Sequence, residues 1–431
     1  MIFLNGGKGP CHTEGSSDRN DFCRLNCSAG NPVTGYGIST ELALAAGCSV
    51  LDDDRLAAAL DGVLARHSLD WDRFLGAAGY HCVERLACAR LEALRPGIIP
   101  DRLRGALRRR SLIAAALHAA QTRVTVTTLA ELQKSGIQAL VLKGAGVAHL
   151  LYSENPAFRS SGDIDILVAP ENFCAAERSL VEMGFHRTWP SAEPPPAARA
   201  MLLTLANVFD FRDPKLGHTI ELHCRATMNP YALPGKFEEM AASSVEVDTT
   251  DGPLRTLDGA LHIAYLCHHA TTSLVFRLKW FGDIARAERR AGGGDCARIV
   301  ADDPRALPQR PAQLVSQVLR RLEREIEAPV QKSTTRAEPL TPLGHVLASM
   351  EQQIYVPPAR NIARLPVEIA NLRFVLGLMP SWRAKAYEWL RSICDPRDAL
   401  LLRLSPRFAV LYAIAAPIFS IWRLVTRSTS R

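Results

Sequence analysis

Two short segments in the middle of the chain carry residue types that could bind metal ions and phosphate. One is an apolar run that ends in Lys143 and Gly144, and the other contains Asp163 and Asp165 in the sequence Asp-Ile-Asp-Ile-Leu-Val. Alternate side chains of a strand share a face, so the two aspartates would lie together, roughly 6 to 7 Å apart. Divalent cations relieve the repulsion between such carboxylates and bind phosphate oxygens. We therefore expect a metal-dependent nucleotide site here.

Further residues could complete this site. A glycine at position 144 would let the backbone approach a phosphate, while the next helix would offer its first amide groups. Glu221 lies on a later strand that could bring a third carboxylate to the pair, and His223 would share the face of Glu221. The carboxylates are stronger candidates for site residues than His223, because strand ends often bury a histidine that only packs in the core.

The elements that must hold these residues follow from hydrophobic periodicity. Within residues 137–168, short apolar runs separated by a helical pattern predict a strand, a helix and a second strand. A further helix is predicted between Pro170 and Gly184 and should pack on the sheet that these strands form. Another strand is predicted at 185–189. Two alternating runs around the turn at 213–217 predict an antiparallel hairpin.

The whole chain is predicted to be an α+β protein, with a small mixed sheet embedded in mainly helical regions. At 431 residues it is too long for one ordinary core. The predicted division is a poorly ordered leader at 1–50, a helical region at 51–135, the core at 136–260 and a helical C-terminal region at 261–431. The leader is rich in Gly, Ser and Asn and lacks a sustained period.

Composition and charge favour a soluble globular protein with anionic ligands. Apolar residues make up 47% and charged residues 22%, and the net charge of +7 is spread along the chain. A positive balance suits anionic ligands such as nucleotides, whereas nucleic acid is a possible but less favoured partner because the charge is not gathered into one stripe. Eleven cysteines in irregular positions, with no secretory signal at the N-terminus, predict reduced thiols and a cytoplasmic location.

No transmembrane segment is expected. The uncharged stretch 408–422 contains Pro417 and falls short of the ~20 residues that cross a bilayer, so a buried helix is preferred. Arg423 and Arg427 leave a peripheral membrane contact as the alternative.

The order of these motifs resembles the family of uncharacterised nucleotidyltransferases with the DNA polymerase beta-like fold. The resemblance is carried by Leu-Lys-Gly at 142–144, Arg159, the Asp-Ile-Asp-Ile-Leu-Val stretch at 163–168, Gly-Phe at 184–185 and Ile-Glu-Leu-His at 220–223. It extends less sharply from about Trp71 to the helical segment Leu-Lys-Trp-Phe-Gly-Asp at 278–283.

The resemblance implies a catalytic, metal-binding set of three acids. Asp163 and Asp165 match the family's acidic pair and Glu221 its third acid, so together they would hold Mg²⁺ (or Mn²⁺) on a triphosphate. Gly144 matches the turn. The implied reaction transfers a nucleoside monophosphate from an NTP, with ATP the default, to an unidentified small-molecule or protein acceptor, and releases pyrophosphate.

Basic residues would complete the nucleotide site. Lys143 and Arg159 match basic positions of the family, and Lys279 could join them in offsetting phosphate charge. Lys279 and Asp283 also stand one helical turn apart, so an i,i+4 ion pair is the competing interpretation. His268 and His269 lie on a helix with apolar neighbours, where core packing competes with a role in the site.

Two departures from the family pattern leave alternatives open. The turn reads Gly-Ala at 144–145, where Gly-Ser or Gly-Gly is usual. The third acid is Glu221, where Asp is common in the pattern Asp-Leu-His-Trp, and Cys224 replaces the tryptophan of that pattern. One alternative is a nucleotide-binding or partner-binding module of the same fold whose active site has decayed. The other is an RNA-directed nucleotidyltransferase that uses the arginine-rich helices to follow phosphates.

Overall fold

The computed structural model describes residues 38–415, apart from 67, 192, 216, 234, 307–308, 328–340, 356–363, 404, 409–410 and 413. In this part of the chain, helices and a mixed sheet confirm the predicted α+β fold class. Most of the predicted leader, and most of the stretch 408–422, lie outside the described residues. None of the described helices combines the length and hydrophobicity that crossing a membrane requires.

One seven-stranded sheet has the order β3-β4-β5-β2-β1-β7-β6. The strands are β1 (Ala139–Val141), β2 (Ile164–Val168), β3 (His186–Trp189), β4 (Val208–Arg212), β5 (Thr219–His223), β6 (Ser244–Thr249) and β7 (Gly252–Leu257). Strand β2 pairs in parallel with β5 and antiparallel with β1, whereas β1 pairs in parallel with β7. The central strands therefore bring together segments that are far apart in sequence.

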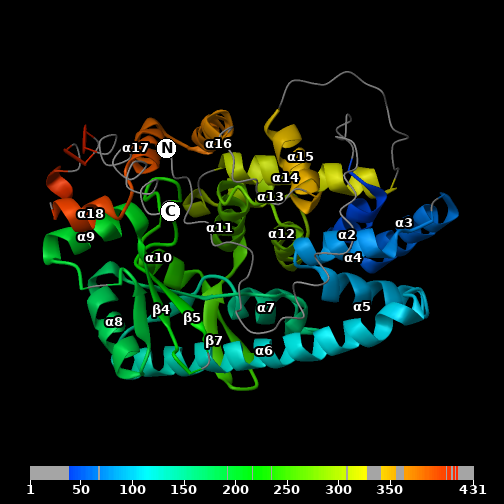
Figure 1. Ribbon diagram of the computed structural model, residues 1–431, viewed down its shortest axis with the longest axis horizontal. Helices are drawn as coiled ribbons and strands as arrows, with labels where there is room; N and C mark the ends of the chain where they lie inside the picture. Colours follow the sequence, from blue (N-terminus) through cyan, green and yellow to red (C-terminus); the bar gives the residue numbers. More distant parts are fainter. Residues whose placement is uncertain are drawn as a thin grey trace, which may run out of the picture.

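The helices fall into groups around this sheet. They are α2 (Thr40–Val50), α3 (Asp53–Arg66), α4 (Trp71–Tyr80), α5 (Glu84–Leu94), α6 (Asp101–Lys134), α7 (Ala145–Leu151), α8 (Phe173–Glu182), α9 (Pro196–Ala206), α10 (Phe237–Ala242), α11 (Gly259–Thr272), α12 (Leu278–Arg290), α13 (Cys296–Asp302), α14 (Gln309–Glu327), α15 (Pro342–Tyr355), α16 (Arg364–Leu378), α17 (Trp382–Ile393) and α18 (Asp398–Leu402). Figure 1 shows α6 running along one side of the molecule, with α2–α5 at one end and α8, α9 and α18 at the other.

The sheet separates two apolar clusters, and the alternation along β2 decides which residues face each. Ile164, Ile166 and Val168 pack in the cluster that includes α8 and α9, whereas Leu167 packs in the larger cluster with the N-terminal helices, α11 and α14. Asp165 alternates with the isoleucines and therefore lies on the face of the larger cluster. The carboxylate face of the sheet is therefore the face that packs against the N-terminal helices, α11 and α14.

Several predicted elements are confirmed. The strands predicted near residues 137–168 and 185–189 are present, and β4 and β5 form the predicted antiparallel hairpin. The helix predicted between Pro170 and Gly184 is α8, preceded by a 3₁₀ turn. The hairpin of β6 and β7 was not predicted, and its strand β7 lies next to β1 in the sheet.

The boundary of the predicted leader differs from the structure at residues 40–50. These residues form α2, capped by the Ser39 side chain, and all of them beyond Thr40 are buried. The segment is rich in alanine and leucine, so it can bury most of its surface against α4, α12 and α14. The helical part of the chain therefore begins about a dozen residues earlier than predicted.

Candidate active site

The register of two parallel strands brings the carboxylates together. Asp165 on β2 is paired with Glu221 on β5, and residues paired across neighbouring strands share a face of the sheet. On the other side of β5, Asp210 of β4 is paired with Glu221. Three acids, of which sequence reasoning identified two, therefore form a row across the sheet.

His223 completes a compact group of possible metal ligands. Its Nε2 lies 3.2 Å from Oδ1 of Asp165 and 3.6 Å from Oε2 of Glu221. One ligand atom from each of these three residues lies within 4.8 Å of the others. The face-sharing of His223 and Glu221 predicted from the alternation of β5 is thus observed, and the histidine enters the site rather than only packing beside it.

Asp163 lies just before β2 and is not part of this group of ligand atoms among the described residues. Its backbone is held firmly, because its carbonyl oxygen accepts hydrogen bonds from Nε2 of Gln121 at 3.0 Å and from Oγ of Ser161 at 2.9 Å. The charge of Asp163 raises the pKa of nearby Lys143. Asp163 therefore borders the site, while Asp165 and Glu221 lie at its centre.

Lys143 contributes a positive charge to the centre of the site. It lies just beyond β1, after Leu142, and its Nζ lies 3.0 Å from Oδ1 of Asp165. Burial opposes the charged form of Lys143, but the attraction of Asp165 outweighs it, so the pKa of the lysine is raised. Burial likewise opposes ionisation of Asp165, yet Lys143 and His223 hold the pKa of this carboxyl well below its usual value. The predicted proximity of Lys143 to the carboxylates is observed.

His223 is also cationic in this arrangement. Burial would lower its pKa, but its hydrogen bonds to Asp165 and Glu221 outweigh burial and raise the pKa to about 9. The two cations approach Asp165 through Oδ1. Its other oxygen, Oδ2, is buried and has no hydrogen-bond partner among the described residues. The site therefore retains an unused ligand atom at its centre.

Gly144 is required by the backbone at the end of β1. Its φ is +60°, and a side-chain Cβ would lie 3.2 Å from both the carbonyl oxygen of Asp163 and Oγ of Ser161. The turn thus packs directly against the backbone of Asp163. Ala145, the departure from the family pattern, is buried in a small apolar cluster with Val126 and Leu254. Its side chain serves core packing here.

Helix α11 borders the site through one face, on which core packing and a role in the site were competing interpretations for its histidines. The charges of Lys143, Asp165 and Glu221 all act on the pKa of Tyr265, which burial raises. One turn later, burial and then Lys143 lower the pKa of His269, whose ring stacks on Tyr265. His269 thus borders the site.

His268 faces elsewhere on the same helix. The charges that act on it belong to Glu388 and Arg391 of α17, and burial lowers its pKa to about 4. The packing interpretation therefore fits His268.

Lys279 lies near this face of α11. Its charge acts on the pKa of His269, and its Nζ lies 5.9 Å from the ring centre of Trp280. Trp280 in turn contacts His269, with ring centres 4.8 Å apart. The i,i+4 ion pair considered from the sequence is not formed, because the carboxylate of Asp283 binds a different partner. Lys279 therefore stays available to the site.

That partner is Arg159, which was expected to contact phosphate. Its Nη2 donates to Oδ2 of Asp283 at 3.0 Å, and both side chains are almost fully buried, with 3% and 0% of their surfaces exposed. The hydroxyl of Tyr152 donates to Oδ1 of Asp283 at 2.9 Å. Arg159 is thus bound within a buried cluster. No local sequence pattern could have indicated this pairing, because the two residues are 124 positions apart in the chain.

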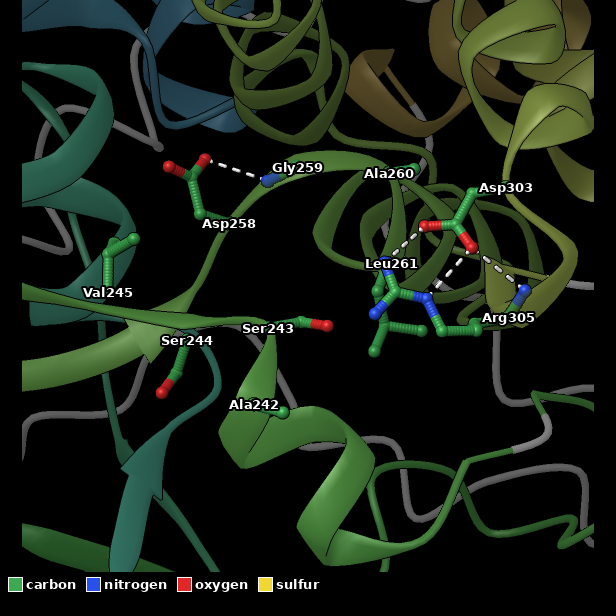
Figure 2. Close-up of a pocket in the computed structure, with 10 residues that line it drawn as sticks. All are labelled: Ala242, Ser243, Ser244, Val245, Asp258, Gly259, Ala260, Leu261, Asp303 and Arg305. Atoms are coloured by element: carbon green, nitrogen blue, oxygen red, sulfur yellow. Dashed lines mark hydrogen bonds and ion pairs between the residues drawn. The ribbon is translucent and has the colours of Figure 1, made fainter.

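A separate pocket of about 310 Å³ lies where α10 and β6 meet the start of α11 (Figure 2). It shares no residue with the carboxylate group. Its charged side chains are already paired, Asp303 with Arg305 at 2.8 Å and Asp258 with Arg290 at 2.9 Å. The charged side chains that line this pocket are therefore already neutralised by partners.

Comparison with known proteins agrees with the geometry. The family described as uncharacterised nucleotidyltransferase matches residues 67–322, which is more than half of the chain and includes every residue of the site. Searches of curated proteins and of solved structures found no significant match. The chain belongs to the uncharacterised nucleotidyltransferase family, and a general function in nucleotidyl transfer follows from this membership.

Proposed function

We propose that the protein transfers a nucleoside monophosphate from an NTP, with ATP the first choice, to an acceptor hydroxyl and releases pyrophosphate. The observation that carries this proposal is the convergence of Asp165 and Glu221 beside an unused buried oxygen, Oδ2 of Asp165. A buried polar atom without a hydrogen-bond partner is costly, and carboxylate oxygens are ligands that Mg²⁺ and Mn²⁺ accept. The donor set therefore fits a divalent cation such as Mg²⁺ or Mn²⁺.

In this proposal Asp165 and Glu221 are the central metal ligands, and Asp163 adds a carboxylate at the border of the site. When bound, the cation would neutralise charge on the triphosphate and polarise the phosphoryl group that is transferred. A new bond forms between the acceptor oxygen and the α-phosphorus, and the bond from that phosphorus to pyrophosphate breaks. The acceptor proton leaves to solvent or to a nearby base.

The chain's own cations would balance the charge of the nucleotide. Lys143 is within 3.0 Å of Asp165, so a modest rotation of its side chain would transfer its charge to a phosphate once a metal ion takes its place. Lys279, near the same face of α11, is proposed as a second phosphate contact. We leave Arg159 out of these contacts, because Asp283 binds its guanidinium in a buried cluster.

The structure weakens the arguments for both alternatives. A decayed site was suggested by Ala145 and Glu221, but Ala145 packs in an apolar cluster and Glu221 lies in register with Asp165. An RNA-directed enzyme was suggested by the arginines of α6 and α14. Several of these are paired with acids, including Arg102 with Asp72 and Arg320 with Asp295.

The test is transfer of label from α-labelled NTP in the presence of Mg²⁺ or Mn²⁺. Because the acceptor is unidentified, the purified protein is added to cell extract and both protein and small-molecule fractions are analysed. We expect label in an acceptor with the wild type and with Asp248→Asn, a control acid exposed on β6 of the same sheet. If the Asp165→Asn and Asp163→Asn variants both label the acceptor as strongly as the wild type does, the proposal is wrong.

A further inference from the structure

His223 stands among the carboxylates, where a nitrogen ligand would change the metal preference of the site. We propose that Nε2 of His223 binds the same divalent cation as Asp165 and Glu221, and that this ligand makes the site favour Mn²⁺ over Mg²⁺. This inference rests on the proposed function, because it concerns the cation that the reaction would use. Nothing in the sequence pattern of three acids calls for a histidine ligand.

The distances fit a single ion. Two ligands of one ion lie at most about 4.2 Å apart, which is twice a metal–ligand distance of about 2.1 Å. Nε2 of His223 lies 3.2 Å from Asp165 and 3.6 Å from Glu221, and all three ligand atoms lie within 4.8 Å of one another. Small side-chain adjustments would therefore bring all three around one cation.

The unpartnered oxygen of Asp165 is a second, independent observation that points to a ligand between Asp165, Glu221 and His223. Asp165 is 0% exposed, and its Oδ2 has no partner among the described residues. An unsatisfied buried polar atom is costly, and more so when the group is charged. A cation between Asp165, Glu221 and His223 would satisfy this oxygen.

The chemistry of the donor atoms determines which metal ion the site prefers. Mg²⁺ strongly favours oxygen ligands and keeps much of its water shell, whereas imidazole nitrogen suits first-row transition ions better. Mn²⁺ accepts both carboxylate and imidazole, so it suits a set of two carboxylates and one histidine. When the metal binds, the proton on Nε2 leaves to solvent, because a ligand histidine must be neutral at the coordinating nitrogen.

Pulsed electron paramagnetic resonance of the Mn²⁺ complex tests this ligand directly. A histidine nitrogen bound to Mn²⁺ gives ¹⁴N modulation, and selective ¹⁵N-histidine labelling of the wild type should convert it to the ¹⁵N pattern. We expect His223→Asn, which offers an oxygen ligand instead, to abolish the modulation. The control His186→Asn removes an exposed histidine on edge strand β3 and should leave the modulation unchanged.

Metal titrations supply the second readout. We expect the ratio of Mn²⁺ to Mg²⁺ affinity to fall at least about tenfold in His223→Asn, a loss in the range caused by removing even an outer-sphere partner of a metal. If Asp165→Asn abolishes Mn²⁺ binding but the wild type shows no ¹⁴N modulation, the histidine ligand is wrong and the carboxylate site stands. If Asp165→Asn leaves Mn²⁺ binding unchanged, both the inference and the proposed site are wrong.

Discussion

Two buried clusters of charge differ in how completely their polar atoms are satisfied. In the first, both oxygens of Asp283 accept hydrogen bonds, from Tyr152 and from Arg159. In the second, both partners of Asp165 approach Oδ1, while Oδ2 has none in the described part of the chain. The cluster of Tyr152, Arg159 and Asp283 is the satisfied cluster. The cluster of Lys143, Asp165, Glu221 and His223 is the unsatisfied cluster, because Oδ2 of Asp165 keeps no hydrogen-bond partner among the described residues.

The comparison also explains why similar residue types serve different ends. Arg159 follows a 3₁₀ turn and Lys143 lies just beyond β1, and both were expected from the family resemblance to contact phosphate. The planar guanidinium of Arg159 forms a fixed, multiply hydrogen-bonded pair, whereas the ammonium of Lys143 makes a point contact that can be exchanged for another cation. The first arrangement suits stability and the second suits exchange with a substrate.

The largest expected effect is loss of transfer when the unsatisfied cluster is altered. Replacing Asp165 with Asn, or Glu221 with Gln, should lower the rate of metal-dependent transfer by at least about 1,000-fold, equivalent to roughly 4 kcal/mol of activation free energy. Initial rates of label transfer measure this effect, and circular dichroism checks the fold. Rates within tenfold of the wild type for both variants would place the chemistry elsewhere.

The next effect is on stability and concerns the satisfied cluster. Asp283→Asn leaves the buried guanidinium of Arg159 without its counter-charge, so we expect the free energy of unfolding to fall by about 3–5 kcal/mol. Denaturant titration measures the loss. Transfer per folded molecule should change less than in Asp165→Asn. A drop in activity as large as that of Asp165→Asn, with little loss of stability, would show that the two clusters have been assigned the wrong roles.

A smaller effect concerns His262, which lies beside the satisfied cluster. Both its ring nitrogens are buried without partners among the described residues, and burial lowers its pKa to about 4 from an unfolded value near 6.5. The unfolded state therefore binds the proton more readily, so stability is lost as the pH falls from 6.5 toward 4. Between pH 7.5 and pH 5 this histidine should lower the free energy of unfolding by about 2 kcal/mol.

The variant His262→Leu isolates that contribution. Its free energy of unfolding should fall less than that of the wild type over the same pH range, as measured by denaturant titration at each pH. Equal pH dependence of the two proteins would show that His262 is not held neutral.

The smallest expected change comes from replacing the satisfied cluster with apolar residues. The triple variant Tyr152→Phe, Arg159→Met and Asp283→Leu removes all three members together, and such replacements are often neutral or stabilising. We expect its free energy of unfolding to lie within about 2 kcal/mol of the wild type, and its transfer activity to persist. Loss of nucleotide binding in this variant would return Arg159 to the phosphate contacts.

The local parts of the fold could be predicted from the sequence because their signals are local. The alternation and turn residues around 213–217 predicted the hairpin of β4 and β5, and the Asp-Ile-Asp-Ile pattern predicted β2. The hairpin of β6 and β7 also had a signal, since Val245 and Val247 alternate with acids before an Asp-Gly turn.

Long-range partners could not be predicted in the same way. The pairing of Asp165 with Glu221 depends on the register of two strands that are not consecutive, and the family resemblance supplied it. Asp210 joins the row only because β4 pairs with β5 in one particular register. The pairing of Arg159 with Asp283 depends on how α12 packs. These contacts follow from tertiary packing, which local periodicity does not encode.

The central claim is that Asp165 and its neighbours hold a divalent cation that binds a triphosphate. Calorimetric titration of wild type and Asp165→Asn with ATP, and with the other three common NTPs, in Mn²⁺ and in EDTA tests it most directly. We expect at least one NTP to bind the wild type tenfold or more tightly with Mn²⁺ than with EDTA, and this difference to vanish in Asp165→Asn. Equal affinity with and without the metal, in both proteins, would contradict the claim.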